Sequence, residues 1–160
     1  MKHFPSKISN LGEVIKGCLN ESERLPDDQG EYPPGTSIIL PSPYDSPVNI
    51  ILTASTIRKK GEGIVAEPSN ISKCIEEVFK LTSDKKIRKL YLPIIGSGHG
   101  GLDLYDALVF LILDIKHSSN KFYHIKEIDI PIREEDTKKL KNIYRLQYLM
   151  LIKQEYDGGI

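Results

Sequence analysis

The sequence contains few of the groups that build metal centres or disulfide frameworks. Only two of the 160 residues are cysteines, and Cys18 and Cys74 lie far apart without the spacing of a metal site. We therefore expect two buried, free thiols in a reducing compartment. The histidines His3, His117 and His124 are scattered along the chain, so neither a metal cluster nor a cofactor is predicted.

The chain also lacks net charge and long hydrophobic runs. Lys+Arg and Asp+Glu both total 22, which argues against non-specific nucleic-acid binding as the main activity. No stretch reaches the roughly 18 apolar residues of a membrane span, and no apolar signal-peptide core follows Met1. With 39% hydrophobic and 28% charged residues, the sequence predicts one cytoplasmic globular domain over residues 1–160.

The most informative stretch, residues 89–108, combines a hydrophobic segment, a glycine-rich loop and a helix start. Residues 90–95 are apolar or aromatic apart from Pro93, which is typical of a buried strand. Four glycines follow within six residues: Gly96, Gly98, Gly100 and Gly101. Asp103 is placed to cap the helix, and Asp106 adds negative charge to its first turn. Such a loop directs backbone N–H groups toward one point, which favours a phosphate or diphosphate.

The glycine spacing alone leaves two interpretations open. Gly96, Gly98 and Gly101 satisfy the G-x-G-x-x-G dinucleotide pattern, whereas the Lys-Ser/Thr ending of a Walker A loop is missing. The alternative is a glycine-rich turn that only lets a helix pack closely on a strand. Four glycines exceed what a tight turn needs, so ligand binding is favoured.

The remaining pattern predicts an α/β fold with a mixed central sheet and helices on both faces, a three-layer α/β/α arrangement. Helices are expected at residues 10–20, 69–81, 103–117 and 134–155, and strands at 35–40, 48–55, 87–95 and 125–132. The first two strands are expected to pair as an antiparallel hairpin, and residues 56–68 to form a loop. Ser69 is the expected cap of the second helix. The closing helix, capped by Asp136 or Thr137, has an apolar face wide enough to meet another chain in a homo-oligomer.

Three segments carry a resemblance to a known family. Residues 92–102, followed by an amphipathic helix, resemble the second phosphate loop of macro domains. The turn at residues 32–36 and the strand at residues 49–55 are similar to the divergent macro branch of Thoeris anti-phage effectors. Residues 6–12 are faintly similar to the start of the first helix in that branch. The family's usual first strand, with its Gly-Asp pair and Asn-rich loop, has no clear counterpart before Phe4.

The resemblance implies an ADP-ribose-type ligand and a set of binding residues. Backbone N–H groups of the loop would hold the diphosphate and distal ribose, through Gly96, Ser97, Gly98, His99, Gly100, Gly101 and Leu102. Residues after the 125–132 strand usually flank the adenine, which points to Ile132 and to Arg133, whose side chain would stack on the base. Ser55, at the end of its strand, would approach the same crevice.

Three functions remain open. The favoured one is a sensor module for an ADP-ribose-derived signal, such as a histidine–ADP-ribose conjugate; in the Thoeris branch a TIR enzyme makes such signals from NAD, and some effectors add transmembrane helices. The second is an ADP-ribosyl hydrolase that uses His99, although the sequence places no partner acid for it. The third is a Rossmann-like NAD-binding protein in which Asp129 or Glu134 holds a ribose. No catalytic residue is assigned.

Overall fold

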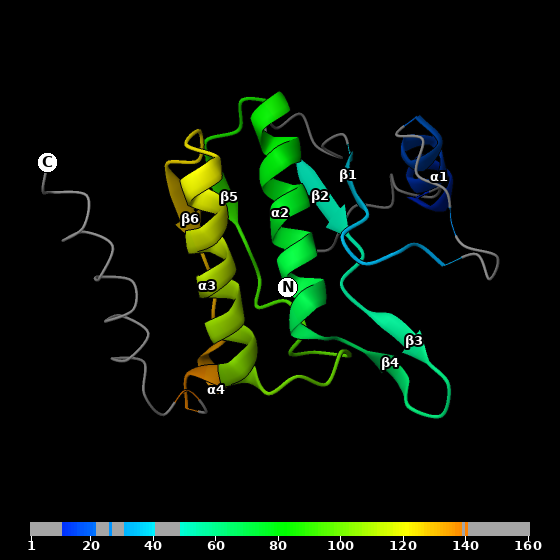
Figure 1. The fold of residues 1–160 in the computed structure, drawn as a ribbon, viewed down its shortest axis with the longest axis vertical. Helices are drawn as coiled ribbons and strands as arrows, with labels where there is room; N and C mark the ends of the chain where they lie inside the picture. Colours follow the sequence, from blue (N-terminus) through cyan, green and yellow to red (C-terminus); the bar gives the residue numbers. More distant parts are fainter. Residues whose placement is uncertain (1–10, 22–25, 27–30, 41–48, 139, 141–160) are drawn as a thin grey trace, which may run out of the picture.

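The computed structural model describes residues 11–21, 26, 31–40, 49–138 and 140, which form an α/β fold (Figure 1). In chain order the elements are α1 (Leu11–Glu21), β1 (Ser37–Leu40), β2 (Ile50–Thr53), β3 (Ile57–Lys59), β4 (Gly63–Val65), α2 (Pro68–Asp84), β5 (Lys89–Tyr91), α3 (Leu104–Lys121), β6 (Glu127–Asp129) and α4 (Glu134–Thr137). The α/β class predicted from the sequence is confirmed.

The described strands form three two-stranded ladders of both orientations. β1 and β2 pair antiparallel with Ser37 opposite Thr53, which confirms the predicted hairpin. β5 and β6 pair parallel with Leu90 opposite Ile128. β3 and β4 form a further antiparallel hairpin where the sequence analysis predicted only a loop. The tight turn between these two strands contains Gly61, whose φ of +86° is a backbone conformation that glycine adopts without steric cost.

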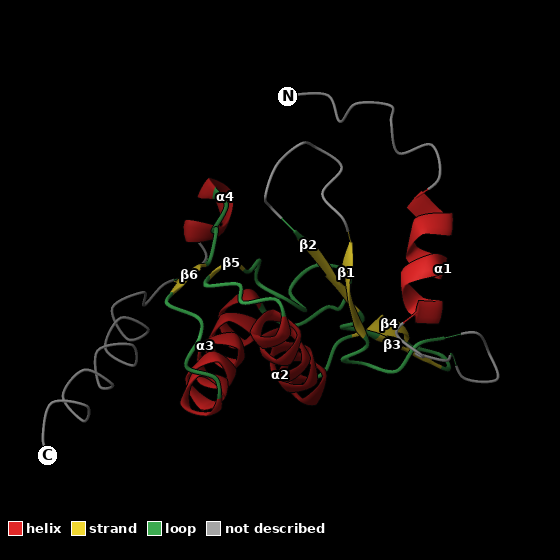
Figure 2. Cartoon of the chain, turned by 90° about the horizontal axis from the view of Figure 1, so that it is seen from above, coloured by secondary structure: helices red, strands yellow, loops and turns green. Residues whose placement is uncertain are grey.

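The two long helices cover one face of the strands. Figure 2 shows α2 and α3 side by side beneath β1, β2, β5 and β6. Their inner faces supply a continuous core of buried residues, made up of Ile71, Ile75, Val78, Phe79 and Leu111 with Leu90 and Leu92 from the β5 segment. A second cluster joins Leu19 of α1 to Ile38 and Leu40 of β1. The apolar residues at helical spacing therefore form the interior, as their periodicity predicts.

Several element boundaries differ from the predicted ones. The expected strand over residues 87–95 is shortened to β5, because Pro93 has no N–H to donate and the glycine loop follows. α2 begins at Pro68 with Glu67 as its N-cap, so the predicted cap at Ser69 is wrong. Proline suits the first helical position, where the missing N–H costs no hydrogen bond.

The helix α4 begins at Glu134, as predicted, but its N-cap is a different residue. Its N-cap is Arg133, and Asp136 lies buried inside α4, so the predicted cap at Asp136 or Thr137 is wrong. The remainder of the predicted 134–155 helix beyond Leu140, including its wide apolar face, lies outside the described residues. Within the described part of the chain, no helix has both the length and the apolar character that a membrane crossing requires.

Candidate functional site

The glycine loop, residues 96–102, connects β5 to α3 and folds back on itself. Gly96 and Gly101 have φ values of +91° and +72°, in the left-handed region that favours glycine. The N–H of Leu102 donates to the carbonyl oxygen of Gly96 at 3.1 Å, and the N–H of Gly101 donates to that of Gly98 at 3.1 Å. These two bonds fix the curvature of the loop without using the amides at its centre.

The central amides of the loop have no acceptor within the described part of the protein. The N–H groups of Ser97, Gly98, His99 and Gly100 make no hydrogen bond to described residues. The Ser97 hydroxyl donates to the carbonyl oxygen of Ile94 at 3.1 Å, which holds the turn before them. Consecutive N–H groups without protein acceptors are the feature that binds anions in glycine loops. The loop can therefore take a phosphate or diphosphate.

The start of α2 packs directly under this loop. The N–H of Ala66 donates to the carbonyl oxygen of Gly100 at 2.9 Å. A Cβ atom added to Gly100 would lie 2.4 Å from the Ala66 Cβ atom, so glycine is required there by the protein itself. The N-cap Glu67 makes no capping bond through its side chain and instead pairs with Lys59 at 2.6 Å. The positive end of the α2 dipole thus lies next to the loop.

The N-terminus of α3 is less available to an anion than that of α2, because its N-cap side chain already bonds to its first N–H groups. Asp103 Oδ1 accepts hydrogen bonds from the N–H groups of Tyr105 at 2.8 Å and Asp106 at 3.3 Å, which confirms the predicted cap. This carboxylate uses donors that an anionic ligand would otherwise take. The loop amides and the α2 end, rather than the α3 N-terminus, are therefore the available anion-binding groups.

Asn70, in the first turn of α2, is a candidate that the sequence analysis missed. Its side chain is 3% exposed, and its Nδ2 atom is buried without a hydrogen-bond partner among the described residues. The adjacent Ile71 places its Cδ1 atom 3.4 Å from where a Cβ on Gly96 would lie, so this turn borders the loop. An unpaired buried amide is costly, and a ligand would satisfy it. No sequence signal marks Asn70, since it is not the helix cap.

Ser55 and the loop reach the same groove. A groove of about 840 Å³ lies between β2 and β5, and Ser55, Ile95 and Gly96 are among its lining residues. The fold therefore brings the end of β2 close to the start of the loop, as the predicted crevice requires. Whether Ser55 contacts a ligand stays a prediction.

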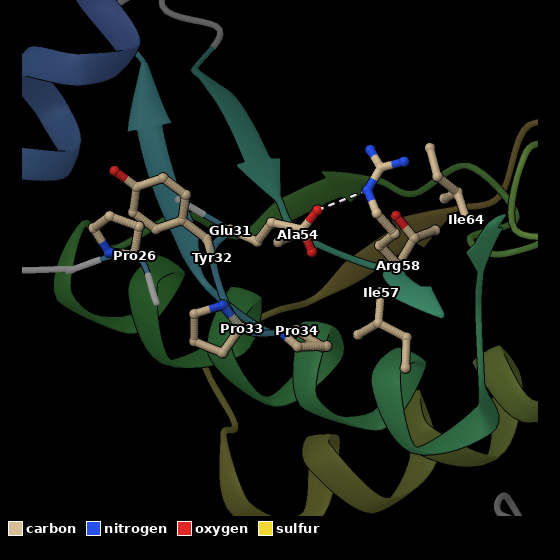
Figure 3. A pocket seen from close by; sticks show the side chains of 10 residues that line it. Pro26, Glu31, Tyr32, Pro33, Pro34, Ala54, Ile57, Arg58 and Ile64 are labelled. Carbon is tan, nitrogen blue, oxygen red and sulfur yellow. Dashed lines mark hydrogen bonds and ion pairs between the residues drawn. The ribbon is translucent and has the colours of Figure 1, made fainter. Parts of the chain in front are cut away.

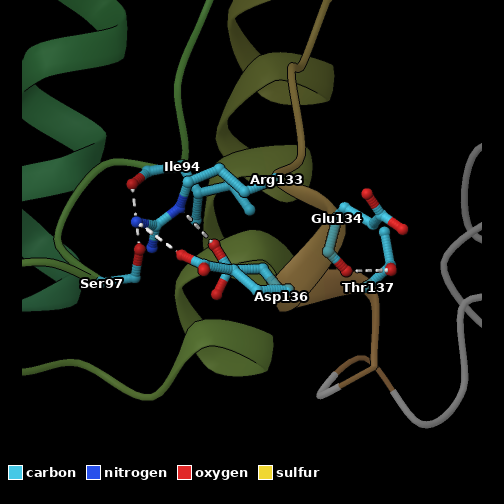
Figure 4. Close-up of polar contacts among 7 residues, drawn as sticks. Ile94, Ser97, Arg133, Glu134, Asp136 and Thr137 are labelled. Carbon is cyan, nitrogen blue, oxygen red and sulfur yellow. Dashed lines mark hydrogen bonds and ion pairs between the residues drawn. The ribbon is translucent and has the colours of Figure 1, made fainter.

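The predicted adenine contacts have other partners in this structure. The Arg133 Nε atom donates to Asp136 Oδ2 at 2.7 Å, and its Nη1 atom lies 3.0 Å from Glu135 Oε1 (Figure 4). The hydrogen bond to Asp136 and the charge of both carboxylates raise the pKa of Arg133, which stays cationic. Ile132 packs against the buried cluster of Leu108, Ile112 and Leu140. Stacking of Arg133 on an adenine thus remains a prediction. It requires the guanidinium to stack on the base while it keeps its contacts with these two carboxylates.

A second pocket lies beside the Tyr32–Thr36 turn (Figure 3). It has a volume of about 770 Å³ and is lined by Pro26, Glu31, Tyr32, Pro33, Pro34, Ala54, Thr56, Ile57, Arg58 and Ile64. Arg58 Nε donates to Glu31 Oε1 across its rim at 2.9 Å. The adjoining turn has Pro34 and Gly35 at its centre, and the N–H of Thr36 donates to the carbonyl oxygen of Pro33 at 3.0 Å. Because Gly35 has a φ of +93°, this arrangement is a type II turn.

His99 is the only imidazole of the glycine loop, and its side chain is exposed. No described carboxylate contacts it, so the structure shows no general acid–base pair in the loop. The described residues also contain no group of three or more His, Cys, Asp or Glu side chains that would hold a metal ion. The chemistry available at the loop is therefore anion binding by backbone donors.

The chain was compared with protein families and with curated proteins. Residues 14–111 match the family model described as Macro domain, and this range contains β1 to β5, α2 and the complete glycine loop. The comparison with curated proteins finds no match to the chain. Because the family match spans more than half of the 160 residues, the protein belongs to the macro domain family, whose members bind or hydrolyse ADP-ribose-related ligands.

Proposed function

We propose that the protein is a non-catalytic sensor that binds an ADP-ribose-derived nucleotide through the glycine loop. The observation that carries this proposal is the run of N–H groups from Ser97 to Gly100, which have no acceptor among the described residues. Two phosphates of an ADP-ribose unit present several acceptor oxygens to such a run. The positive end of α2 beside the loop adds to the attraction.

The arrangement around His99 favours sensing over hydrolysis. Hydrolysis needs an activated water and a group that takes its proton. His99 has no described carboxylate partner, and the nearest acid in sequence, Asp103, caps α3. In the sensor, His99 contacts the ligand or shapes the loop.

The source of the signal follows from the resemblance of the turn at residues 32–36 and the glycine loop to the Thoeris branch. The ligand is a conjugate, such as histidine–ADP-ribose, that a TIR enzyme makes from NAD during anti-phage defence. The sensor acts in the cytoplasm, as a single macro-like domain that forms a homo-oligomer or joins an effector. The pocket beside Tyr32 includes Ala54 and Thr56 at the end of β2, and its Glu31, Tyr32 and Arg58 side chains suit the polar, non-adenosine end of such a conjugate.

The test is calorimetric titration of the protein with ADP-ribose, NAD and the histidine–ADP-ribose conjugate. The key variant is Gly98→Val, because a Cβ on Gly98 meets no protein atom within 4 Å and its φ is not in the left-handed region. Gly12→Val is the matched control, since a Cβ on Gly12 also meets nothing within 4 Å. We expect the conjugate to bind about tenfold more tightly than ADP-ribose, which is about 1.4 kcal/mol.

In the same titration Gly98→Val should abolish binding, while Gly12→Val should leave it unchanged. Tightest binding of NAD would support the dinucleotide interpretation instead. Release of free ADP-ribose from the conjugate, lost in His99→Ala, would make the protein a hydrolase. Unaltered binding by Gly98→Val would remove the loop from the site.

A further inference from the structure

The positive charges of the chain are unevenly distributed, although its net charge is zero. α2 and α3 both begin beside the glycine loop and run side by side, so their C-terminal ends lie together at the opposite end of the molecule (Figure 1). Four exposed cations follow these two helix ends in the sequence: Lys85, Lys86, Arg88 and Lys126. Because α2 has 17 residues, these cations lie about 25 Å from the loop.

The segment after α2 and the segment after α3 are joined to each other. The Oγ1 atom of Thr82, which is fully buried, lies 3.0 Å from Nε2 of His124. The His124 ring also packs edge-on against Phe79, with 6.5 Å between the ring centroids. Further along, the N–H of Lys126 donates to the carbonyl oxygen of Arg88 at 2.8 Å. The cations of both segments are therefore held on one surface rather than on two independent loops.

The four cations make no ion pair with any residue that the structure describes. Two nearby acids pair with other lysines, since Glu127 contacts Lys89 and Glu76 lies 3.6 Å from Lys121. Asp84, the last residue of α2, is the remaining acid of the two described segments. The parts of the chain outside the described residues contain more basic than acidic side chains, so they bring no net negative charge. The surface therefore has a positive charge that an external anion can neutralise.

Lys86 has a backbone conformation that favours glycine. Its φ is +56°, and among the described residues it is the one non-glycine residue with a positive φ. The N–H of Lys86 donates to the carbonyl oxygen of Ser83 at 3.1 Å. The N–H of Ile87 donates to that of Thr82 at 3.0 Å, which completes the Schellman motif at the end of α2. A cation here complements the helix dipole, but Lys85 supplies that charge without a positive φ. A strained lysine where glycine fits better indicates that its charge has a function.

An exposed aromatic ring belongs to the same surface. Tyr123 is 76% exposed, whereas its neighbours Phe122 and His124 pack against each other with 6.3 Å between their centroids. Exposed aromatic rings among cations are typical of surfaces that bind single-stranded nucleic acids, where the cations contact phosphates and the ring stacks on a base. An acidic polypeptide would use the charges but not the ring. A membrane surface would use several apolar side chains, and Tyr123 is the one large exposed hydrophobic residue in the two described segments.

We propose that the surface formed by Lys85, Lys86, Arg88, Tyr123 and Lys126 binds a single-stranded nucleic acid. The four cations would contact successive phosphates, and the ring of Tyr123 would stack on one base. This surface and the glycine loop lie at opposite ends of α2 and α3, so binding here does not depend on ADP-ribose binding (Figure 1). The two sites would allow the protein to hold a nucleotide and a nucleic-acid strand at the same time.

The test is a titration of fluorescein-labelled oligouridylate, of about 12 nucleotides, with the full chain, followed by fluorescence anisotropy. We expect saturable binding at about 0.1 M NaCl, with a Kd no weaker than about 100 μM. A plot of log K against log[NaCl] should have a slope of about −3, because each of four phosphate contacts contributes about −0.7 on a single strand. Absence of saturable binding, or displacement of the oligonucleotide by excess ADP-ribose, overturns the proposal. Failure here leaves the proposed ADP-ribose binding unaffected, because that site is titrated separately.

Two substitutions separate the contribution of charge from that of stacking. Lys86→Gly removes one cation and keeps the turn, because glycine adopts a positive φ without strain. It should weaken binding about fivefold at about 0.1 M NaCl and make the salt slope shallower by about 0.7. Tyr123→Ser should weaken binding by at least about fivefold and leave the salt slope unchanged, because stacking releases no counterions. Unchanged affinity in either variant overturns the proposal.

Lys60→Gly is the matched control, because it removes an exposed lysine from the β3–β4 turn and adds a glycine there as well. It should change neither the affinity nor the salt slope, and weakening equal to that of Lys86→Gly would show that the oligonucleotide adsorbs to cations in general. Polyglutamate and vesicles of phosphatidylserine and phosphatidylcholine are the competing anions. Displacement of the oligonucleotide by polyglutamate at equal charge would assign the surface to an acidic polypeptide, and displacement by the vesicles would assign it to a membrane. Each of these three results overturns the proposal.

Discussion

The backbone N–H of Ala66 donates to the carbonyl oxygen of Gly100 at 2.9 Å, and this bond joins the start of α2 to the glycine loop. The two residues are 34 positions apart in the chain by their numbers, 100 and 66. Their contact fixes the loop against the positive end of a helix that the motif itself does not contain. The anion-binding character of the loop therefore depends on α2 as well as on its own glycines.

Gly100→Ala should destabilise the protein, because the new Cβ atom would lie 2.4 Å from the Ala66 Cβ and 2.9 Å from the Gly96 carbonyl oxygen. We expect a loss of about 1–3 kcal/mol in the free energy of unfolding, typical of overpacking. Gly98→Ala is the matched control and should change stability by no more than about 0.5 kcal/mol. Urea denaturation measures both, and equal effects would contradict the packing described here.

Asn70→Leu should stabilise the free protein while weakening ADP-ribose binding. The variant keeps a side chain of similar size and removes the Nδ2 donor, which is buried without a partner among the described residues. We expect a gain of about 1 kcal/mol in the free energy of unfolding. Thermal unfolding with and without ADP-ribose separates the two effects. A variant that is less stable, or that binds ADP-ribose as well as the parent, would exclude Asn70 from the site.

Asp114→Asn should change how stability depends on pH. Burial raises the pKa of Asp114, although the hydroxyl of Ser72, 2.9 Å from both carboxylate oxygens, and the charge of His117 oppose the shift. The unfolded chain loses this proton near a pKa of about 3.9, before the folded protein does. Stability is therefore lost as pH rises from that value through the raised pKa. The variant should lack this loss, which urea denaturation across acidic pH measures; parallel pH profiles would contradict it.

The two cysteines should differ in their reaction with a thiol reagent. Cys74 is fully buried, burial raises the pKa of its thiol, and its Sγ atom donates to the carbonyl oxygen of Ala54 at 3.2 Å. Cys18 is half-buried, contrary to the predicted burial of both thiols. The native protein should react at one thiol only, and at two after unfolding. Rapid modification of Cys74 in Cys18→Ser would show that the core opens readily.

Local sequence patterns predict much of this fold. The apolar positions of α2 and α3, the Asp103 cap and the β1–β2 hairpin follow from periodicity and turn residues. The β3–β4 hairpin is not predicted by the same analysis, because its strands have three residues each and β3 contains the charged residues Arg58 and Lys59. Strand pairing at that length is decided by the surrounding structure rather than by propensity.

For the candidate site, too, the sequence predicts the features made by consecutive residues but not the contacts made by packing. The glycine loop is visible in the sequence because its residues are consecutive, and its family is confirmed. Ala66 and Asn70 are not visible, because they reach the loop only through the packing of α2 beneath it. The family resemblance points to Arg133 by its position after a strand, whereas its contacts with Glu135 and Asp136 depend on side-chain geometry at the start of α4.

The most direct test of the central claim is a ¹H–¹⁵N NMR titration of the protein with ADP-ribose. If the loop holds the diphosphate, the amide signals of Ser97, Gly98, His99 and Gly100 should shift first and furthest, because their N–H groups gain acceptors. The shifts should disappear in Gly98→Val and persist in Gly12→Val. Binding that moves the amides around Tyr32 and Arg58 but leaves residues 97–100 unchanged would contradict the account.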